Sequence, residues 1–307
     1  MTAYAHLAPN VLTIMGNPPC ERIEHIRGDR WLPYSLAVAA VNKLEMLFAQ
    51  TNKRRRVGLL LVGPTSNGKS MILEYFQKKH PGNNEPGSES AEKPVVMVLA
   101  PPKPDLGAFY NAVLTAVGAH FKASDTFSWK EIQVKSMLRM LKTRMIVIDE
   151  LHHLASSRAD HLVQFLNGIK NLSTALQVPI IGAGTKLALT VIRRDPQIEN
   201  RIHPFPLPAW KDNREFRTLL HSIERILPLK RPSGLAEDKL AHKILHMCDG
   251  DKKSESYGAT IGEIMDLLCE AGVKAIETEK EKIDDKILDQ VSYKAPSKRQ
   301  EHADRET

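Results

Sequence analysis

The stretch Gly63-Pro64-Thr65-Ser66-Asn67-Gly68-Lys69-Ser70 fits the pattern G-x-x-x-x-G-K-[ST] of a phosphate-binding loop. It follows the apolar run 57–62 and precedes a helical pattern over residues 71–79, so the loop would connect a strand to a helix, as phosphate-binding loops do. In such a loop, backbone N–H groups at a helix N-terminus surround the β-phosphate of a nucleotide. The octapeptide and the next residue, Met71, are therefore the predicted nucleotide-binding residues.

The two polar residues at the end of the loop have separate predicted roles. Lys69 would reach the β- and γ-phosphates, and the Ser70 hydroxyl would ligate Mg²⁺. Further along, four apolar residues lead into Asp149 and Glu150, which is typical of a buried parallel strand that ends at a site. Asp149 suits an outer-shell hold on Mg²⁺, and Glu150 suits the polarisation of an attacking water. A strand followed by a solvated acidic turn is the alternative.

The type of nucleotide follows from the motifs around the loop. A guanine-nucleotide protein needs an Asn/Thr-Lys-x-Asp box, but residues 185–188 lack the Asp and residues 42–45 precede the loop. Such a protein also needs Asp-x-x-Gly, whereas Asp149 is followed by Glu-Leu-His. ATP with Mg²⁺ is therefore the predicted cofactor pair. A small-molecule kinase is the minority alternative, since no Arg-rich lid segment is evident.

Composition is that of an ordinary globular chain. The 307 residues are 42% hydrophobic and 26% charged, enough for one large or two modest domains with a real core. No apolar run of 18 residues and no secretory signal is found, so we expect a cytoplasmic protein without a membrane partner. Three widely spaced cysteines argue against a disulfide framework and against structural zinc.

The net charge of +7 favours a polyanionic partner, and part of it lies in the basic block 53–56. Aromatic residues are only 6% of the chain and no base-reading motif is present, so double-stranded DNA would be held through its backbone. Arg54, Arg55 and Lys103 are the candidate DNA contacts. A solvated turn at 53–56 and an ordinary exposed loop lysine at 103 are the alternatives.

Strands and helices alternate from residue 31 to 208, which predicts an α/β domain with a mostly parallel sheet. Ligands of such sheets bind outside the carboxyl ends of the strands, where Gly63, Asp149 and Thr185 would meet. Thr185 is the candidate γ-phosphate sensor, with a simple strand cap as the alternative. We divide the chain into an N-terminal arm (1–30), this core (31–208), an all-helical segment (209–290) and a charged, disordered tail (291–307).

Several blocks together resemble the AAA+ ATPases, and more narrowly the TniB/TnsC group of transposition ATPases. The blocks are residues 55–70, 146–153, 179–185, 198–202 and 258–264. The resemblance implies an AAA+ P-loop domain, a parallel sheet flanked by helices, with a small C-terminal α-helical lid at 209–290. It also implies a protein that assembles side by side, with an arginine of one subunit reaching the γ-phosphate of its neighbour. Arg201 matches that position, and Arg193 and Arg194 are the alternatives.

The resemblance further implies an ATP-dependent regulator of DNA transposition in the bacterial cytoplasm, which associates with the nucleoid when it acts. Such a protein forms a homo-oligomeric ring or helical filament on double-stranded DNA and recruits a transposase and a target-selection adaptor of the TniQ type. ATP hydrolysis then dismantles the assembly. An AAA+ helicase loader or replication initiator is one rival, and a non-hydrolysing ATP-binding adaptor is the other.

The pair His152-His153 directly follows the acidic motif and raises the question of a metal site. No third His or Cys stands at ligand spacing, since His161 is eight residues beyond His153. We therefore expect the two histidines to act beside the catalytic carboxylates or in a partner contact.

Overall fold

The computed structural model describes residues 4–50, 57–83, 91–122, 124–248 and 258–293. It divides into two compact units, Val38–Pro208 and the combination of Met1–Ala37 with Ala209–Thr307. Two sequence features lie outside the described residues: the basic block 53–56, which includes Arg54 and Arg55, and positions 294–307 of the tail.

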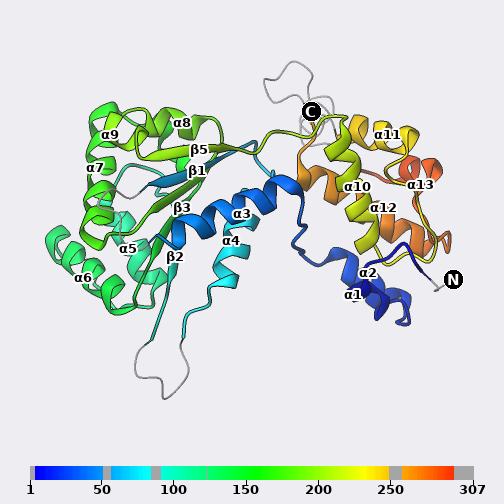
Figure 1. Ribbon diagram of the computed structural model, residues 1–307, viewed down its shortest axis with the longest axis horizontal. Helices are drawn as coiled ribbons and strands as arrows, with labels where there is room; N and C mark the ends of the chain where they lie inside the picture. Colours follow the sequence, from blue (N-terminus) through cyan, green and yellow to red (C-terminus); the bar gives the residue numbers. More distant parts are fainter. Residues whose placement is uncertain (1–3, 51–56, 84–90, 123, 249–257, 294–307) are drawn as a thin grey trace, which may run out of the picture. The chain divides into compact units, whose positions relative to one another are not determined.

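The first unit is built on a five-stranded sheet in the order β2-β3-β4-β1-β5 (Figure 1). Its strands are β1 (Gly58–Val62), β2 (Val95–Leu99), β3 (Met145–Asp149), β4 (Ile180–Gly184) and β5 (Ile202–Pro206). Every pairing is parallel, with Val62 opposite Gly184 and Leu99 opposite Asp149. The carboxyl ends of β1, β3 and β4 therefore meet at one edge, as the sequence predicts.

Helices cover the sheet because both of its faces are apolar. Leu60, Val62, Ile146 and Ile148 belong to a buried cluster with residues of the helices that follow β2, β3 and β4, while the alternate residues of β1 and β3 are equally buried. Helices α3 and α4 contact each other through Phe48 and Phe76, whose ring centroids are 5.8 Å apart. The helices are α3 (Ser35–Phe48), α4 (Lys69–Lys79), α5 (Leu106–Ala116), α6 (Phe127–Met140), η1 (Leu151–Ser156), α7 (Ala159–Leu176), α8 (Leu187–Ile192) and α9 (Pro196–Glu199).

Strand β5 is an element that the sequence did not reveal. It carries Pro204 and Pro206, and three of its five residues are exposed. Proline is tolerated in an edge strand, where one side of the backbone has no partner strand. An edge strand also needs no continuous apolar run, so the pattern that reveals β1 and β3 is missing here.

Over its described residues, the second unit is mainly helical, with an isolated antiparallel bridge between Trp210 and Ala259. Its helices are α1 (Pro9–Leu12), α2 (Pro19–Arg27), α10 (Arg214–Ile226), α11 (Asp238–Cys248), α12 (Ile261–Glu277) and α13 (Asp285–Gln290). The residues expected to form an N-terminal arm contain α1 and α2, and α2 packs on α12. Arg22 of α2 is 1% exposed and donates to Glu281 Oε1 at 2.9 Å and to the carbonyl of Pro228. Among the described residues, no helix combines the length and apolar character that a membrane span requires.

Candidate nucleotide-binding site

The predicted phosphate-binding loop connects β1 to α4 in the order expected. Gly68 stands before the first residue of α4 and has φ +78°, a left-handed conformation that glycine adopts without strain. The Lys69 ammonium is buried inside the loop, where it donates to the carbonyl oxygens of Gly63 at 3.1 Å and Pro64 at 2.5 Å. Thr65 and Ser66 at the tip are exposed, and Met71 is 37% exposed. The loop N–H groups thus stand at the N-terminus of an eleven-residue helix.

The structure brings Ser70 and Asp149 into direct contact. The Ser70 hydroxyl donates to Asp149 Oδ2 at 2.5 Å, and the other Asp149 oxygen accepts the backbone N–H of Glu150 at 2.8 Å. Asp149 is 2% exposed, whereas Glu150 is half-buried. Glu150 has φ +55°, a sparsely populated conformation for a residue with a side chain. Such conformations cluster at functional sites, where the surrounding structure holds them.

The charges and polar atoms of this edge fit MgATP. Burial lowers the pKa of the Lys69 ammonium, and the negative charges of Glu150 and Asp149 act to raise it. A buried cation of this kind is stabilised further by a bound anion such as a phosphate. The hydroxyl oxygen of Thr185, just after β4, is buried and has no hydrogen-bond partner, so it can accept or donate a bond to a ligand.

Asn67 and Gly63 anchor the loop to the chain that follows β5. The Asn67 side chain is 2% exposed and donates to the carbonyls of Leu207 at 2.8 Å and Pro208 at 3.0 Å. A Cβ on Gly63 would lie 2.5 Å from the Leu207 carbonyl oxygen, so only glycine permits this close approach. The contribution of Leu207 and Pro208 was not predicted, because nothing local in their sequence marks them.

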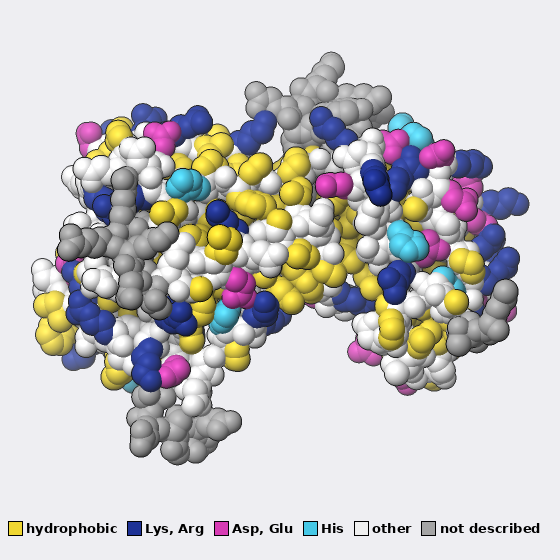
Figure 2. All heavy atoms as spheres, in the orientation of Figure 1, with side chains coloured by type: hydrophobic (Ala, Val, Ile, Leu, Met, Phe, Trp, Pro, Cys, Tyr) yellow, Lys and Arg dark blue, Asp and Glu magenta, His cyan; other side chains and the backbone are white. Residues whose placement is uncertain are grey.

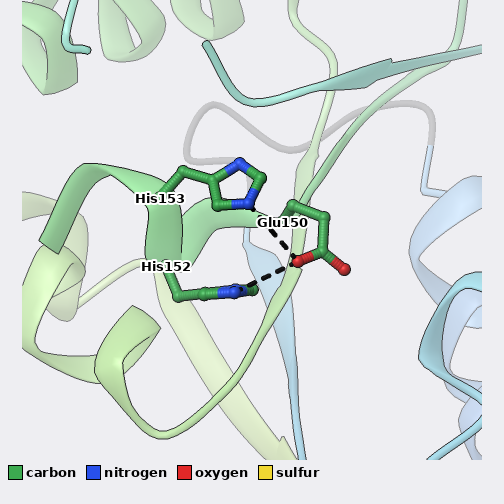
Figure 3. Close-up of side chains that lie close together, drawn as sticks. All are labelled: Glu150, His152 and His153. Carbon is green, nitrogen blue, oxygen red and sulfur yellow. Dashed lines mark ion pairs between the residues drawn. The ribbon is translucent and has the colours of Figure 1, made fainter. Parts of the chain in front are cut away.

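Glu150 also has two histidine neighbours, drawn in Figure 3. His152 Nε2 lies 3.2 Å from Glu150 Oε2, and His153 Nε2 lies 3.9 Å from the same oxygen. One ligand-type atom from each of the three residues falls within 4.8 Å of the others. The sequence predicted that the histidines act beside the carboxylates or in a partner contact, and it did not indicate Glu150 as the third member of the group.

Arg201 lies at the opposite edge of the sheet from the loop. It immediately precedes β5, and its carbonyl accepts the N–H of Gly58, the first residue of β1. The five residues of β1 span about 16 Å at 3.3 Å per residue, so Arg201 is placed away from the nucleotide of its own subunit. Its Nε is buried without a hydrogen-bond partner. Arg193 and Arg194 are exposed, and Arg193 Nε is 3.7 Å from Glu199.

The DNA candidate that the structure describes, Lys103, is exposed in the loop between β2 and α5. Its loop follows the carboxyl end of β2, where Ala100 N–H bonds to the Asp149 carbonyl at 2.8 Å. Lys103 therefore lies at the edge of the sheet formed by the carboxyl ends of the strands, where the nucleotide loop also lies. On the face shown in Figure 2, the described Lys and Arg side chains are scattered among acidic and apolar ones and form no continuous basic surface.

A family model described as "Bacterial TniB protein" matches residues 22–212, which is more than half of the chain. The chain belongs to the TniB family. The match confirms the resemblance drawn from the sequence blocks, and it spans both the phosphate-binding loop and the Asp149-Glu150 motif. No curated protein matches the chain significantly.

Solved structures similar to this chain include two ORC proteins and Hsp104. The Aeropyrum pernix ORC2 protein in its ADPNP–ADP complexes has a TM-score of 0.54 and 14% identity, covering 87% of this chain and 70% of that one. The A. pernix ORC1 protein in complex with DNA has a TM-score of 0.52 and 14% identity, covering 88% and 68%. The S. cerevisiae Hsp104–ADP complex has a TM-score of 0.51 and 18% identity, covering 88% and 43%.

These likenesses show the fold. The chain has the AAA+ fold predicted from the sequence, with a parallel sheet flanked by helices and a C-terminal helical region. Family and fold together support an ATPase of the transposition or initiator type.

Proposed function

We propose that this protein is an ATP-dependent regulator of DNA transposition, which oligomerises on double-stranded target DNA, recruits a transposase and disassembles on ATP hydrolysis. The observation that supports it most is the meeting of Lys69, Ser70 and Asp149 at one sheet edge in a chain of the TniB family. The TniQ-type adaptor and action at the bacterial nucleoid, in the cytoplasm, belong to the same proposal.

Nucleotide binding would use the loop and its buried lysine. Lys69 would exchange the carbonyls of Gly63 and Pro64 for phosphate oxygens, which bring the negative charge that a buried ammonium needs. Ser70 and Asp149, already hydrogen-bonded, would hold Mg²⁺, with Asp149 acting through its contact to the hydroxyl. When bound, Mg²⁺ neutralises charge on the phosphates. Thr185 would then bond to the γ-phosphate through its free hydroxyl.

Hydrolysis would depend on Glu150. Its carboxylate is half-buried and next to Asp149, so it can orient a water and accept its proton as the water attacks the γ-phosphate. Arg201 is at the other sheet edge, which suits contact with the nucleotide of a neighbouring subunit. Loss of the γ-phosphate would remove that contact and weaken the assembly.

The test compares two substitutions that separate binding from hydrolysis. Glu150→Gln keeps the shape of the side chain but removes the base, so phosphate release should fall by at least ~100-fold while ATP still binds. Assemblies on duplex DNA should persist, as seen by electron microscopy and sedimentation. Lys69→Ala should abolish ATP binding and assembly together. An unchanged assembly lifetime for Glu150→Gln would contradict the switch, and a strictly monomeric wild type with a slowly hydrolysed ATP mimic and long DNA would contradict the assembly.

A replication initiator or helicase loader is the second candidate, since the similar solved structures include ORC1 bound to DNA. Both candidates would use the same nucleotide residues, so the partner decides between them. Pull-down of a transposase supports the first function, and pull-down of a replicative helicase supports the second. Phosphate release with and without duplex DNA separates both from a non-hydrolysing adaptor.

A further inference from the structure

His152 lies between the catalytic carboxylate and the end of strand β4. Its Nε2 is 3.2 Å from Glu150 Oε2, and its Nδ1 is 3.5 Å from the backbone N of Thr185. The histidine is in η1, which starts directly after Glu150, while Thr185 is 33 residues further along the chain. One imidazole ring therefore contacts the predicted base, as Figure 3 shows, and also the backbone N of the predicted γ-phosphate sensor, Thr185.

The hydrogen-bond partners determine which ring nitrogen carries the proton. A backbone N–H can only donate, so Nδ1 of His152 must be the acceptor from Thr185. A neutral imidazole with an accepting Nδ1 has its hydrogen on Nε2, and that N–H faces the Glu150 carboxylate. A hydrogen bond donated to a carboxylate is stronger than one between neutral groups and fixes the orientation of both partners.

The same contacts argue against a metal ion held by Glu150, His152 and His153. A histidine that ligates through Nε2 donates its other N–H to an acceptor, but the neighbour of Nδ1 here is itself a donor. Zinc bonds of about 2.0 Å also place ligand atoms about 3.3 Å apart at a tetrahedral centre. His153 Nε2, at 3.9 Å from Glu150 Oε2, is farther away than that.

Strand β4 ends in a residue that leaves room for the ring. A Cβ on Gly184 would lie 3.3 Å from His152 Nδ1 and 2.8 Å from the Ala188 side chain. Both spacings are tighter than ordinary van der Waals contact, so a side chain at this position would force the Ala188 side chain or the imidazole ring to shift. Gly184 therefore makes the contact between η1 and the end of β4 possible.

We propose that His152 is a positioning residue, which orients the Glu150 carboxylate and ties it to the backbone of Thr185. Engagement of a γ-phosphate by the free Thr185 hydroxyl would then be transmitted to Glu150 through one side chain. This inference rests on the proposed ATPase function and deepens it. It assigns to the first histidine of the pair a role in hydrolysis and to the second, exposed histidine none.

Two amide substitutions separate the two contacts of the ring. The substitution His152→Gln places an amide nitrogen near the position of Nε2 and keeps the donor to Glu150, whereas His152→Asn places an amide oxygen near Nδ1 and keeps only the Thr185 contact. We expect His152→Asn to lower kcat about tenfold, because misplacing a reacting group by about 1 Å costs up to about a hundredfold. His152→Gln should remain within about threefold of the wild type. KM for ATP, and Kd for a fluorescent ATP analogue, should change little in either variant, because binding depends on Lys69.

His153→Ala is the matched control, because it removes the neighbouring exposed ring. Its kcat should be higher than that of His152→Asn, since the inference gives His153 no role in hydrolysis. Equal kcat values for the Gln and Asn variants, or a rise in KM without a fall in kcat, would overturn the inference. So would calorimetric binding of Zn²⁺ at micromolar concentration that His152→Asn abolishes, because it would show a metal site. A wild type that binds ATP but releases no phosphate would instead refute the proposed ATPase function, so the two failures are distinguishable.

Discussion

The nucleotide edge and the helical unit both bury a cation, but they satisfy it differently. Lys69 is 5% exposed and is held by two loop carbonyls, whereas Arg22 is 1% exposed and faces a carboxylate. Burial acts to raise the pKa of Glu281, but hydrogen bonds from Arg22 and from the Lys230 backbone outweigh it and lower that pKa. Burial lowers the pKa of Lys69, against the pull of Glu150 and Asp149.

This difference in partners distinguishes Lys69, which is part of a candidate binding site, from Arg22, which forms a buried ion pair within the fold. The partners of Lys69 are neutral carbonyls that a phosphate can replace with a gain in charge pairing. A phosphate could not replace the partners of Arg22 with the same gain, since its guanidinium already bonds to both Glu281 oxygens and to the Pro228 carbonyl. Substitutions at the nucleotide edge should therefore change activity at constant stability, and substitutions in the helical unit should do the reverse.

The largest loss of activity is expected for a substitution of Arg201. This arginine would be a third cation to compare with Lys69 and Arg22, one that acts on the nucleotide of a neighbouring subunit. Arg201→Ala should lower DNA-stimulated phosphate release by about a thousandfold, the lower end for an arginine that acts in trans. Mixing the Arg201→Ala and Lys69→Ala proteins should restore part of the activity, because an intact loop of the first protein can then bind ATP and meet an intact arginine of the second. The measurement is phosphate release as a function of the mixing ratio.

Arg193→Ala is the control for Arg201, since that guanidinium is exposed and lies 3.7 Å from Glu199. Its activity should stay near that of the wild type. A thousandfold loss at Arg193 or Arg194, with none at Arg201, would move the trans-acting role to that position.

A smaller effect is expected at Arg22. Arg22→Ala should lower the free energy of unfolding of the helical unit by about 3 kcal/mol, because it leaves Glu281 buried without its partner. Urea denaturation measures the change, and ATP affinity should be unaltered where the protein is folded.

Lys230→Ala is the matched control, since Lys230 also contacts Glu281, at 3.4 Å, but its side chain is 52% exposed. We expect a change of less than about 1 kcal/mol for it. Equal losses of unfolding free energy for Arg22→Ala and Lys230→Ala would contradict the conclusion that burial determines the strength of the contact with Glu281.

The smallest effect is expected at the cap of α12. Thr260 Oγ1 accepts the Glu263 N–H at 3.3 Å, and Glu263 Oε2 accepts the Thr260 N–H at 2.8 Å. Thr260→Ala should lower the free energy of unfolding by about 1 kcal/mol, while Thr260→Ser, which keeps the hydroxyl, should change it by less. A shift in the urea midpoint for Ser as large as that for Ala would show that the hydroxyl is not what stabilises the helix end.

The parts of the site that the sequence predicted are contiguous segments. The loop around Lys69 forms its ligand from successive backbone N–H groups, and Asp149 ends an apolar run that is buried on both faces. Edge strand β5 was missed because its exposed proline-containing sequence has no such run. Helices α1 and α2 were taken for an arm because the partner that buries α2, helix α12, is distant in sequence.

By itself, the sequence determined the phosphate-binding loop and the two carboxylates, since each depends on residues close together in the chain, and the resemblance of several separate blocks to a known family indicated the AAA+ fold. Only the tertiary structure decided that Asn67 anchors the loop to residues 207 and 208, that Arg201 stands at the far sheet edge, and that His152 joins Glu150 to Thr185. Those relations depend on strand order and on helix packing. A parallel sheet brings together residues tens of positions apart, and no local pattern encodes that pairing.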